Sequence, residues 1–128
     1  MSRLTEDDIK YRYITPAIEK SGWKKEQVFF EYFFTDGQMI VRGTTSKRGK
    51  RKRADYLLTH KNGQMPLAIV EAKDGSHEIG SGMQQAIEYA SILNIPFAYS
   101  SNGEGFLEHD FLTGKETQYT NDDFPTEE

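Results

Sequence analysis

Two carboxylates and a lysine lie near the middle of the chain, where an apolar run ends: Asp55, then Glu71 and Lys73 separated by one residue. Because side chains alternate along a strand, Glu71 and Lys73 should point the same way. The chain has no cysteine, and a pair of carboxylates suits a hard cation such as Mg²⁺ or Mn²⁺. A lysine beside them can orient a water molecule or stabilise transition-state charge. These residue types predict metal-assisted hydrolysis of a phosphate ester, although an acid-x-Lys triplet alone also fits an ordinary surface ion pair.

The turn before the apolar run decides whether Asp55 joins Glu71. A two-residue turn at Asn62-Gly63 would pair Asp55 with Val70 and leave the carboxylates on opposite faces of the hairpin. One extra residue, such as a bulge at a left-handed Gly63, would pair Asp55 with Glu71 on one face. Directly paired residues have Cβ atoms about 5 Å apart, so a shared metal ion requires the second register.

The elements that must position these residues follow from apolar periodicity and turn residues. A helix is expected from Thr5 to Ser21, capped by Thr5, acidic in its first turn and kinked or split at Pro16. A second helix is expected from Met83 to Leu93. Strands are expected over Gln27–Phe34, Gln38–Arg42, Ala54–Thr59, Pro66–Ala72, Phe97–Ser100 and Gly105–Phe111. This order predicts an α/β domain with a mixed central sheet flanked by helices.

A dense basic run precedes Asp55 and is expected to form a loop. Its members are Lys47, Arg48, Lys50, Arg51, Lys52 and Arg53. The net charge of −4 argues mildly against a nucleic-acid partner, but a local basic strip can still bind a phosphate backbone. A solvated loop is the other interpretation. His60, His77 and His109 lack the spacing of a metal site, and no apolar stretch is long enough to span a membrane.

At Asp55, Glu71 and Lys73 the sequence resembles the PD-(D/E)xK nuclease superfamily, whose motif is an acid on one strand and acid-x-Lys on the next. Ala54 stands where the motif's name has proline. Further blocks resemble, in order, the N-terminal nuclease domain of type I restriction enzyme R subunits. These blocks are Thr5–Asp8, Ile14–Ile18, Gly22-Trp23, Lys47–Tyr56, Pro66–Lys73, Gln85–Tyr89 and Pro96–Gly103.

The resemblance implies a restriction-endonuclease-like fold and a Mg²⁺-dependent endonuclease, with Mn²⁺ as a substitute, that cuts double-stranded DNA. It adds Gln85 and Tyr89, the family's Gln-x-x-x-Tyr motif, as catalytic residues on one helix face. It also adds an acid of the first helix as a metal ligand beside Asp55 and Glu71. Asp8 matches that position best, ahead of Asp7 and Glu19.

The same resemblance predicts a nuclease domain over residues 1–119 and an acidic connector over 120–128, leading to an ATP-driven motor domain absent from this sequence. It implies methyltransferase and specificity subunits as partners, together with DNA, and a cytoplasmic location. One alternative is a non-catalytic DNA-binding or regulatory module of the same fold, and the intact Asp–Glu–Lys set favours the enzyme over it. The other is a globular interaction domain in which that set is coincidental.

Overall fold

The computed structural model describes residues 4–35, 51–60 and 65–126. Its centre is a six-stranded sheet in the order β1-β2-β3-β4-β5-β6, in which only β3 and β4 are parallel. The strands are β1 Val28–Thr35, β2 Arg51–Thr59, β3 Pro66–Ala72, β4 Phe97–Ser101, β5 Phe106–Asp110 and β6 Glu116–Tyr119. The mixed sheet with helices on both sides confirms the expected fold class.

The first helix begins at the predicted residue and is divided as Pro16 requires. Thr5 caps α1 (Glu6–Ile9), a π-helical turn follows over Lys10–Ile14, and α2 runs from Thr15 to Lys20. Proline has no N–H and its ring clashes with the carbonyl four residues before it. The preceding turn widens, so that the Thr15 N–H donates to the Lys10 carbonyl. Such π-turns recur at functional sites.

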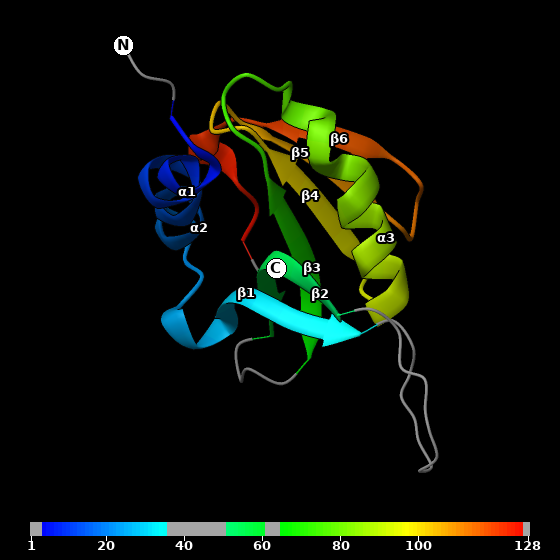
Figure 1. Cartoon of the computed structure of the whole chain (residues 1–128). Coiled ribbons are helices and arrows are strands. Elements are labelled where there is room, and N and C mark those ends of the chain that lie inside the picture. The colour runs from blue at the N-terminus through cyan, green and yellow to red at the C-terminus, as the bar shows by residue number, and fades with distance from the viewer. Residues whose placement is uncertain (1–3, 36–50, 61–64, 127–128) are drawn as a thin grey trace.

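Two apolar clusters, one on each face, hold the helices to the sheet. α1 and α2 cover one face and α3 (Met83–Leu93) covers the other (Figure 1). The first cluster includes Ile14, Ile18 and Val70, and the second includes Ile69, Ala86 and Ala90. Because β3 supplies alternate residues to both clusters, it is buried on both faces and is the strand from which Glu71 and Lys73 extend. Short 3₁₀ turns lie at Lys25–Gln27, Ile79–Gly82 and Asn121–Asp123.

Several predicted boundaries need correction. The basic run was expected to be a loop, but β2 already begins at Arg51, since Arg51–Arg53 pair with the end of β1. β4 extends one residue further than expected, to Ser101, and β5 spans only Phe106–Asp110. β6 was not predicted. The expected strand Gln38–Arg42 and the Asn62-Gly63 turn lie outside the described residues.

The segment after β6 packs back onto the first helix layer. Phe124 is buried in the same cluster as Ile18, its carbonyl accepts the Ser21 hydroxyl at 2.7 Å, and the Pro125 carbonyl accepts the Trp23 indole N–H at 2.9 Å. The start of the expected acidic connector is thus in contact with the domain. In the part of the chain that the structure describes, no helix has the length and apolar character needed to span a membrane.

Candidate active site

Asp55 and Glu71 meet because β2 and β3 pair in the register that a shared site requires. Tyr56 pairs with Val70 and Leu58 with Ala68, which places Asp55 opposite Glu71 one step further along. The extra residue is a bulge within β3: Thr59 pairs with Pro66, so Leu67 has no partner in β2. A shared site requires one residue more than a two-residue turn provides, and the bulge supplies it inside the strand.

Beyond Tyr56 and Val70, the two carboxylates take the place of backbone carbonyls. The Asp55 N–H donates to Glu71 Oε2 at 3.0 Å, and the Ala72 N–H donates to Asp55 Oδ2 at 2.8 Å. Both side chains are buried. Each carboxylate therefore satisfies a backbone donor of the facing strand where the paired register ends, which fixes their mutual position.

The strand alternation also breaks at Asp55. Tyr56 and Leu58 belong to the cluster beneath α1 and α2, whereas Ala54 belongs to the cluster beneath α3. In regular strands residues two apart share a face, so the strand turns over at Asp55. On β1 the facing residue is Glu31, whose φ of 55° is left-handed; non-glycine residues rarely adopt this conformation. The distortion leaves Asp55 within reach of both the sheet and the first helix layer.

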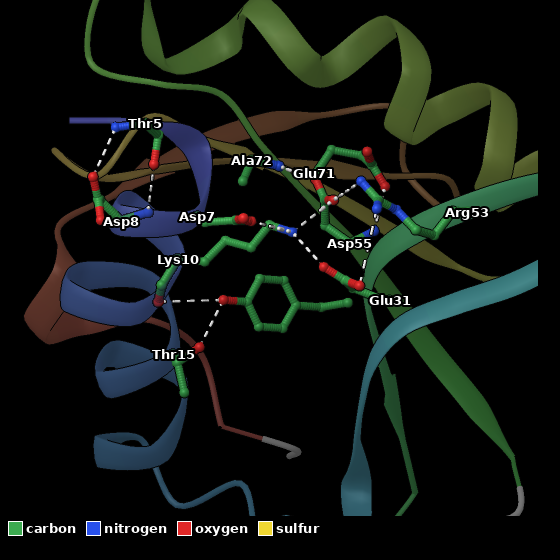
Figure 2. A network of polar contacts seen from close by, with 11 residues as sticks. Thr5, Asp7, Asp8, Lys10, Thr15, Glu31, Arg53, Asp55, Glu71 and Ala72 are labelled. Atoms are coloured by element: carbon green, nitrogen blue, oxygen red, sulfur yellow. Dashed lines mark hydrogen bonds and ion pairs between the residues drawn. The ribbon is translucent and has the colours of Figure 1, made fainter. Parts of the chain in front are cut away.

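Lys10, which the sequence pattern did not single out, reaches Asp55 from the π-helical turn. Lys10 Nζ lies 3.1 Å from Asp55 Oδ1, 3.4 Å from Glu31 Oε2 and 3.7 Å from Asp7 Oδ1. Arg53 approaches the same acids, at 3.6 Å from Asp55 and 3.9 Å from Glu31 (Figure 2). Glu31 and Asp55 thus share two cations, the buried Lys10 and the half-exposed Arg53, and Asp7 contacts Lys10.

The burial of this cluster changes the protonation of Glu71. Burial first, and the charge of Asp55 second, raise the pKa of Glu71 to about 8, against the lowering effect of Lys10. Burial alone would lower the pKa of Lys10, but the charges of Asp55 and Glu31 outweigh it and raise it. Lys10 therefore stays charged, while Glu71 needs more positive charge nearby to ionise fully at neutral pH.

Lys73 follows β3 on the side of the 3₁₀ turn that leads into α3. The side chains of Glu71 and Lys73 both border Gly82. A Cβ atom at that position would lie 3.5 Å from Glu71 Cβ and 3.6 Å from Lys73 Cγ. The Ser100 hydroxyl holds the turn there, since it accepts the Gly82 N–H at 3.0 Å and donates to the Ile79 carbonyl at 2.7 Å. Glu71 and Lys73 share a side, as the alternation predicts.

The remaining site candidates occupy more varied positions. Gln85 Nε2 donates to the Tyr89 hydroxyl at 2.5 Å, and the Tyr89 ring is buried edge-on against Phe34 at 5.0 Å. The two residues share a helix face, as expected of residues four apart, and contact each other.

Of the helix acids, Asp8 is used as a cap. Its carboxylate accepts the Thr5 N–H at 3.0 Å, and its own N–H donates to the Thr5 hydroxyl at 3.1 Å. Asp7 is the acid that approaches the cluster through Lys10. Glu19 lines a groove of about 470 Å³ between the helix layer and β1, together with Asp7 and Glu31.

The basic run is only partly within the described residues. Lys47, Arg48 and Lys50 lie outside them, and Arg51 belongs to β2. Lys52 lies 3.9 Å from Glu88 of α3. Arg53 lies 3.6 Å from Asp55.

The sequence did contain signals for the missed residues. Lys10 shares the i, i+4, i+8 stripe of Ile14 and Ile18, both fully buried. A lysine on an apolar stripe is costly to bury without a counter-charge. Glu31 interrupts an aromatic strand and stands opposite Asp55 once β1 and β2 are aligned. Both were single charges in apolar patterns.

Asp55 and Glu71 have the chemistry to hold a hard divalent ion. Across the described ranges, no group of three or more His, Cys, Asp or Glu side chains is arranged to hold a metal. Mg²⁺, however, is usually bound by one or two carboxylates, with water and substrate phosphate completing its shell. A buried pair in which one carboxyl has a raised pKa also gains from an added cation. The residues present fit such an ion.

Comparisons with known proteins agree on one family. Residues 6–125 match the family model described as the type I restriction enzyme R protein N terminus. The type I restriction enzyme EcoAI endonuclease subunit of Escherichia coli is 46% identical over 131 residues, which span 98% of this chain and 16% of that protein. A solved HsdR subunit fragment of a type I restriction enzyme from Vibrio vulnificus superposes with a TM-score of 0.80 at 43% identity, covering 98% of this chain and 24% of that one.

Proposed function

From the premise that the chain belongs to the family of type I restriction enzyme R protein N termini, we propose that it is a Mg²⁺-dependent endonuclease domain that cuts double-stranded DNA. Restriction enzymes are nucleases as a class, and we propose in addition the metal ion, the DNA substrate and the residues that perform the chemistry. Asp55, Glu71 and Lys73 are the residues to which we assign the chemistry, in the arrangement of the PD-(D/E)xK superfamily.

The proposal rests on the hydrogen bonds that join Asp55 and Glu71 where the β2–β3 pairing ends, since each carboxylate accepts a backbone N–H of the facing strand. Asp55 and Glu71 would hold a divalent ion, Mg²⁺ or Mn²⁺, which when bound supplies Lewis acidity toward water and phosphate. The two carboxylates need no large rearrangement, because backbone N–H groups already fix one oxygen of each. Preorganised ligands of this kind reduce the reorganisation that accompanies the chemical step.

Lys73 is assigned to the attacking water and the phosphate. Its side chain borders Gly82 beside Glu71, where an ammonium can orient a water molecule and stabilise the extra negative charge of the transition state. Gln85 and Tyr89 would add neutral hydrogen-bond donors. Among the helix acids, Asp8 is the sequence-based choice for a further ligand, although its carboxylate caps α1 and Asp7 lies nearer the cluster.

The basic run is assigned to the DNA backbone. Replacing Lys47, Arg48, Lys50 and Arg51 by glutamine should weaken DNA binding and reduce the dependence of affinity on salt, because each phosphate contact contributes about −0.9 to the slope. An unchanged slope, measured by fluorescence anisotropy, would mean that these residues are merely solvated.

The chain spans 16% of its E. coli relative, so the rest of the assembly belongs to the proposal. We assign ATP binding and translocation to a motor domain beyond the acidic segment 120–128. Methyltransferase and specificity subunits would be the other protein partners, in the cytoplasm.

The decisive experiment is nicking of supercoiled DNA with Mg²⁺ by the wild-type chain and by Lys73→Ala, with Lys115→Ala as the exposed-lysine control. We expect Lys73→Ala to lose at least about a hundredfold in rate and Lys115→Ala to match the wild type. Mn²⁺ calorimetry runs in parallel. If the wild type and both variants bind metal and DNA but none of them nicks DNA, the non-catalytic alternative is favoured. Absence of metal binding by the wild type would reject the metal site.

A further inference from the structure

Lys10 is a buried cation whose partners are all acids of the candidate active site. Its side chain is 2% exposed, and Nζ contacts Asp55, Glu31 and Asp7 at 3.1, 3.4 and 3.7 Å. Nζ also lies 5.3 Å from the centre of the Phe30 ring. No phosphate or partner protein can reach an ammonium buried in this way without rearrangement, so its role must act through the carboxylates.

The backbone is arranged to bring Lys10 there. The residue opens the π-helical turn ahead of Pro16, and the Tyr56 hydroxyl, at 3.4 Å from the Lys10 carbonyl, anchors the same turn to β2. Tyr56 is fully buried and its hydroxyl also pairs with Thr15 at 2.7 Å. The turn is thus tied to the strand that carries Asp55, one residue away from it.

The result is an Asp55 side chain held at both oxygens. Oδ2 accepts the Ala72 N–H, and Oδ1 faces Lys10 at 3.1 Å and Arg53 at 3.6 Å. A divalent ion bound through Oδ1 would share that oxygen with the ammonium, and one bound through Oδ2 would share the same carboxylate with it. Since like charges repel most strongly where water is excluded, Lys10 and the ion oppose each other at this carboxylate.

We propose that Lys10 is a positioning residue that acts as the site's internal counter-ion: it gathers Asp7, Glu31 and Asp55 and fixes Asp55, while it weakens binding of the divalent cation. The inference rests on the proposed nuclease function. It predicts opposite effects on metal affinity and on the rate of DNA cleavage. Removing the ammonium should tighten metal binding and slow DNA cleavage, because the charge that competed with the ion is also the one that held its ligand in place.

The test replaces Lys10 by methionine, with Lys10→Arg as the charge-retaining variant and Lys20→Met as the matched control. Lys20 belongs to the same helix layer but is exposed and pairs with Asp122 at 2.7 Å. Mn²⁺ affinity by calorimetry, melting temperature with and without Mn²⁺, and nicking at saturating Mn²⁺ are measured on one preparation. We expect Lys10→Met to bind Mn²⁺ at least about tenfold more tightly, to gain more in melting temperature from Mn²⁺ than the wild type does, and to nick at least about tenfold more slowly.

Lys10→Arg should keep Mn²⁺ affinity and nicking close to wild type, and Lys20→Met should change neither. If Lys10 had a merely structural role, Lys10→Met would bind Mn²⁺ no more tightly than the wild type does, and that outcome would overturn the inference. If Lys10→Met does not fold alone, Mn²⁺ should restore folding, and a chain unfolded with and without Mn²⁺ overturns it as well. Wild-type protein that neither binds Mn²⁺ nor nicks rejects the proposed function and this inference together, whereas an active wild type with an unchanged Lys10→Met rejects the inference alone.

Discussion

The two ends of the β2–β3 pair contrast sharply within a few residues. At one end Leu58 and Ala68 are paired, buried and apolar, and both pack in the cluster beneath α1 and α2. At the other end Asp55 and Glu71 are equally buried, but they are ionisable and accept backbone N–H groups. Burial therefore stabilises the first end by removing apolar surface from water, and imposes at the second end a cost that paired charges must offset. One strand pair serves as core and as candidate site.

Substitutions at the two ends should have the largest effects, mainly on stability at the first end and mainly on nicking at the second. Leu58→Ala removes a fully buried side chain and should cost about 2–5 kcal/mol of stability, with an unchanged nicking rate per folded molecule. Asp55→Asn should lower nicking by at least about a hundredfold, or about 2.7 kcal/mol in barrier, and should destabilise the fold by less than Leu58→Ala does. The asparagine oxygen can still accept the Ala72 N–H, and Lys10 keeps Glu31 and Asp7.

Urea denaturation and DNA nicking on both variants test this separation, with Leu112→Ala as the control because Leu112 is 80% exposed. Should Asp55→Asn unfold the chain, or Leu58→Ala abolish nicking in fully folded protein, the two ends would not be functionally distinct.

The β2–β3 pair has an apolar end at Leu58 and Ala68 and an ionic end at Asp55 and Glu71. The sequence predicts the apolar end far better than the ionic end. β3 at Pro66–Ala72 and α3 at Met83–Leu93 have the predicted bounds, because each is specified by a local apolar pattern and by flanking turn residues. Asp55 and Glu71 could be proposed as a pair from strand alternation and the family motif.

Lys10 and the left-handed Glu31 could not be assigned in the same way. Their roles arise only when the first helix layer packs across β1 and β2, and neither contact is local in sequence. β6 was missed because Glu116–Tyr119 is exposed and polar at the sheet edge, which leaves no apolar alternation to detect.

A second prediction concerns pH, which should affect the ionic end alone. Because the pKa of Glu71 is raised from 4.5 to about 8 in the folded chain, the folded state holds a proton that the unfolded state has released between those values. Stability without metal should therefore fall as pH rises through this window, by no more than about 1.4 kcal/mol per pH unit, while Mn²⁺ affinity rises.

Glu71→Gln removes the titrating group, and its melting temperature should change less with pH than that of the wild type over the same window. Thermal melts at several pH values in EDTA measure both proteins. Equal slopes for wild type and Glu71→Gln would show that another group is responsible.

A third prediction extends the ionic end onto α3. Gln85→Ala should lower nicking by more than about tenfold, equivalent to about 1.4 kcal/mol in barrier, with melting temperature and Mn²⁺ affinity nearly unchanged. Tyr89→Phe is the informative partner, since it loses the hydroxyl that Gln85 contacts but keeps the ring against Phe34. Full activity in Gln85→Ala, or a large loss of stability, would assign the pair a structural role.

The smallest predicted effect tests the backbone distortion itself. Glu31 has a φ of 55° opposite Asp55, a conformation that glycine adopts without cost and other residues adopt at a cost. Glu31→Gly and Glu31→Ala remove the same carboxylate from Lys10 and Arg53, so their difference reports only on the backbone. Glu31→Gly should be more stable than Glu31→Ala by about 1 kcal/mol. At Thr117, an exposed position in the regular strand β6, the order should reverse, because glycine weakens an ordinary strand by about 0.5–1 kcal/mol relative to alanine. Urea denaturation of the four variants gives both differences. Alanine more stable than glycine at both positions would mean that the chain is not held in a left-handed conformation at Glu31, and that strand regularity extends through the site.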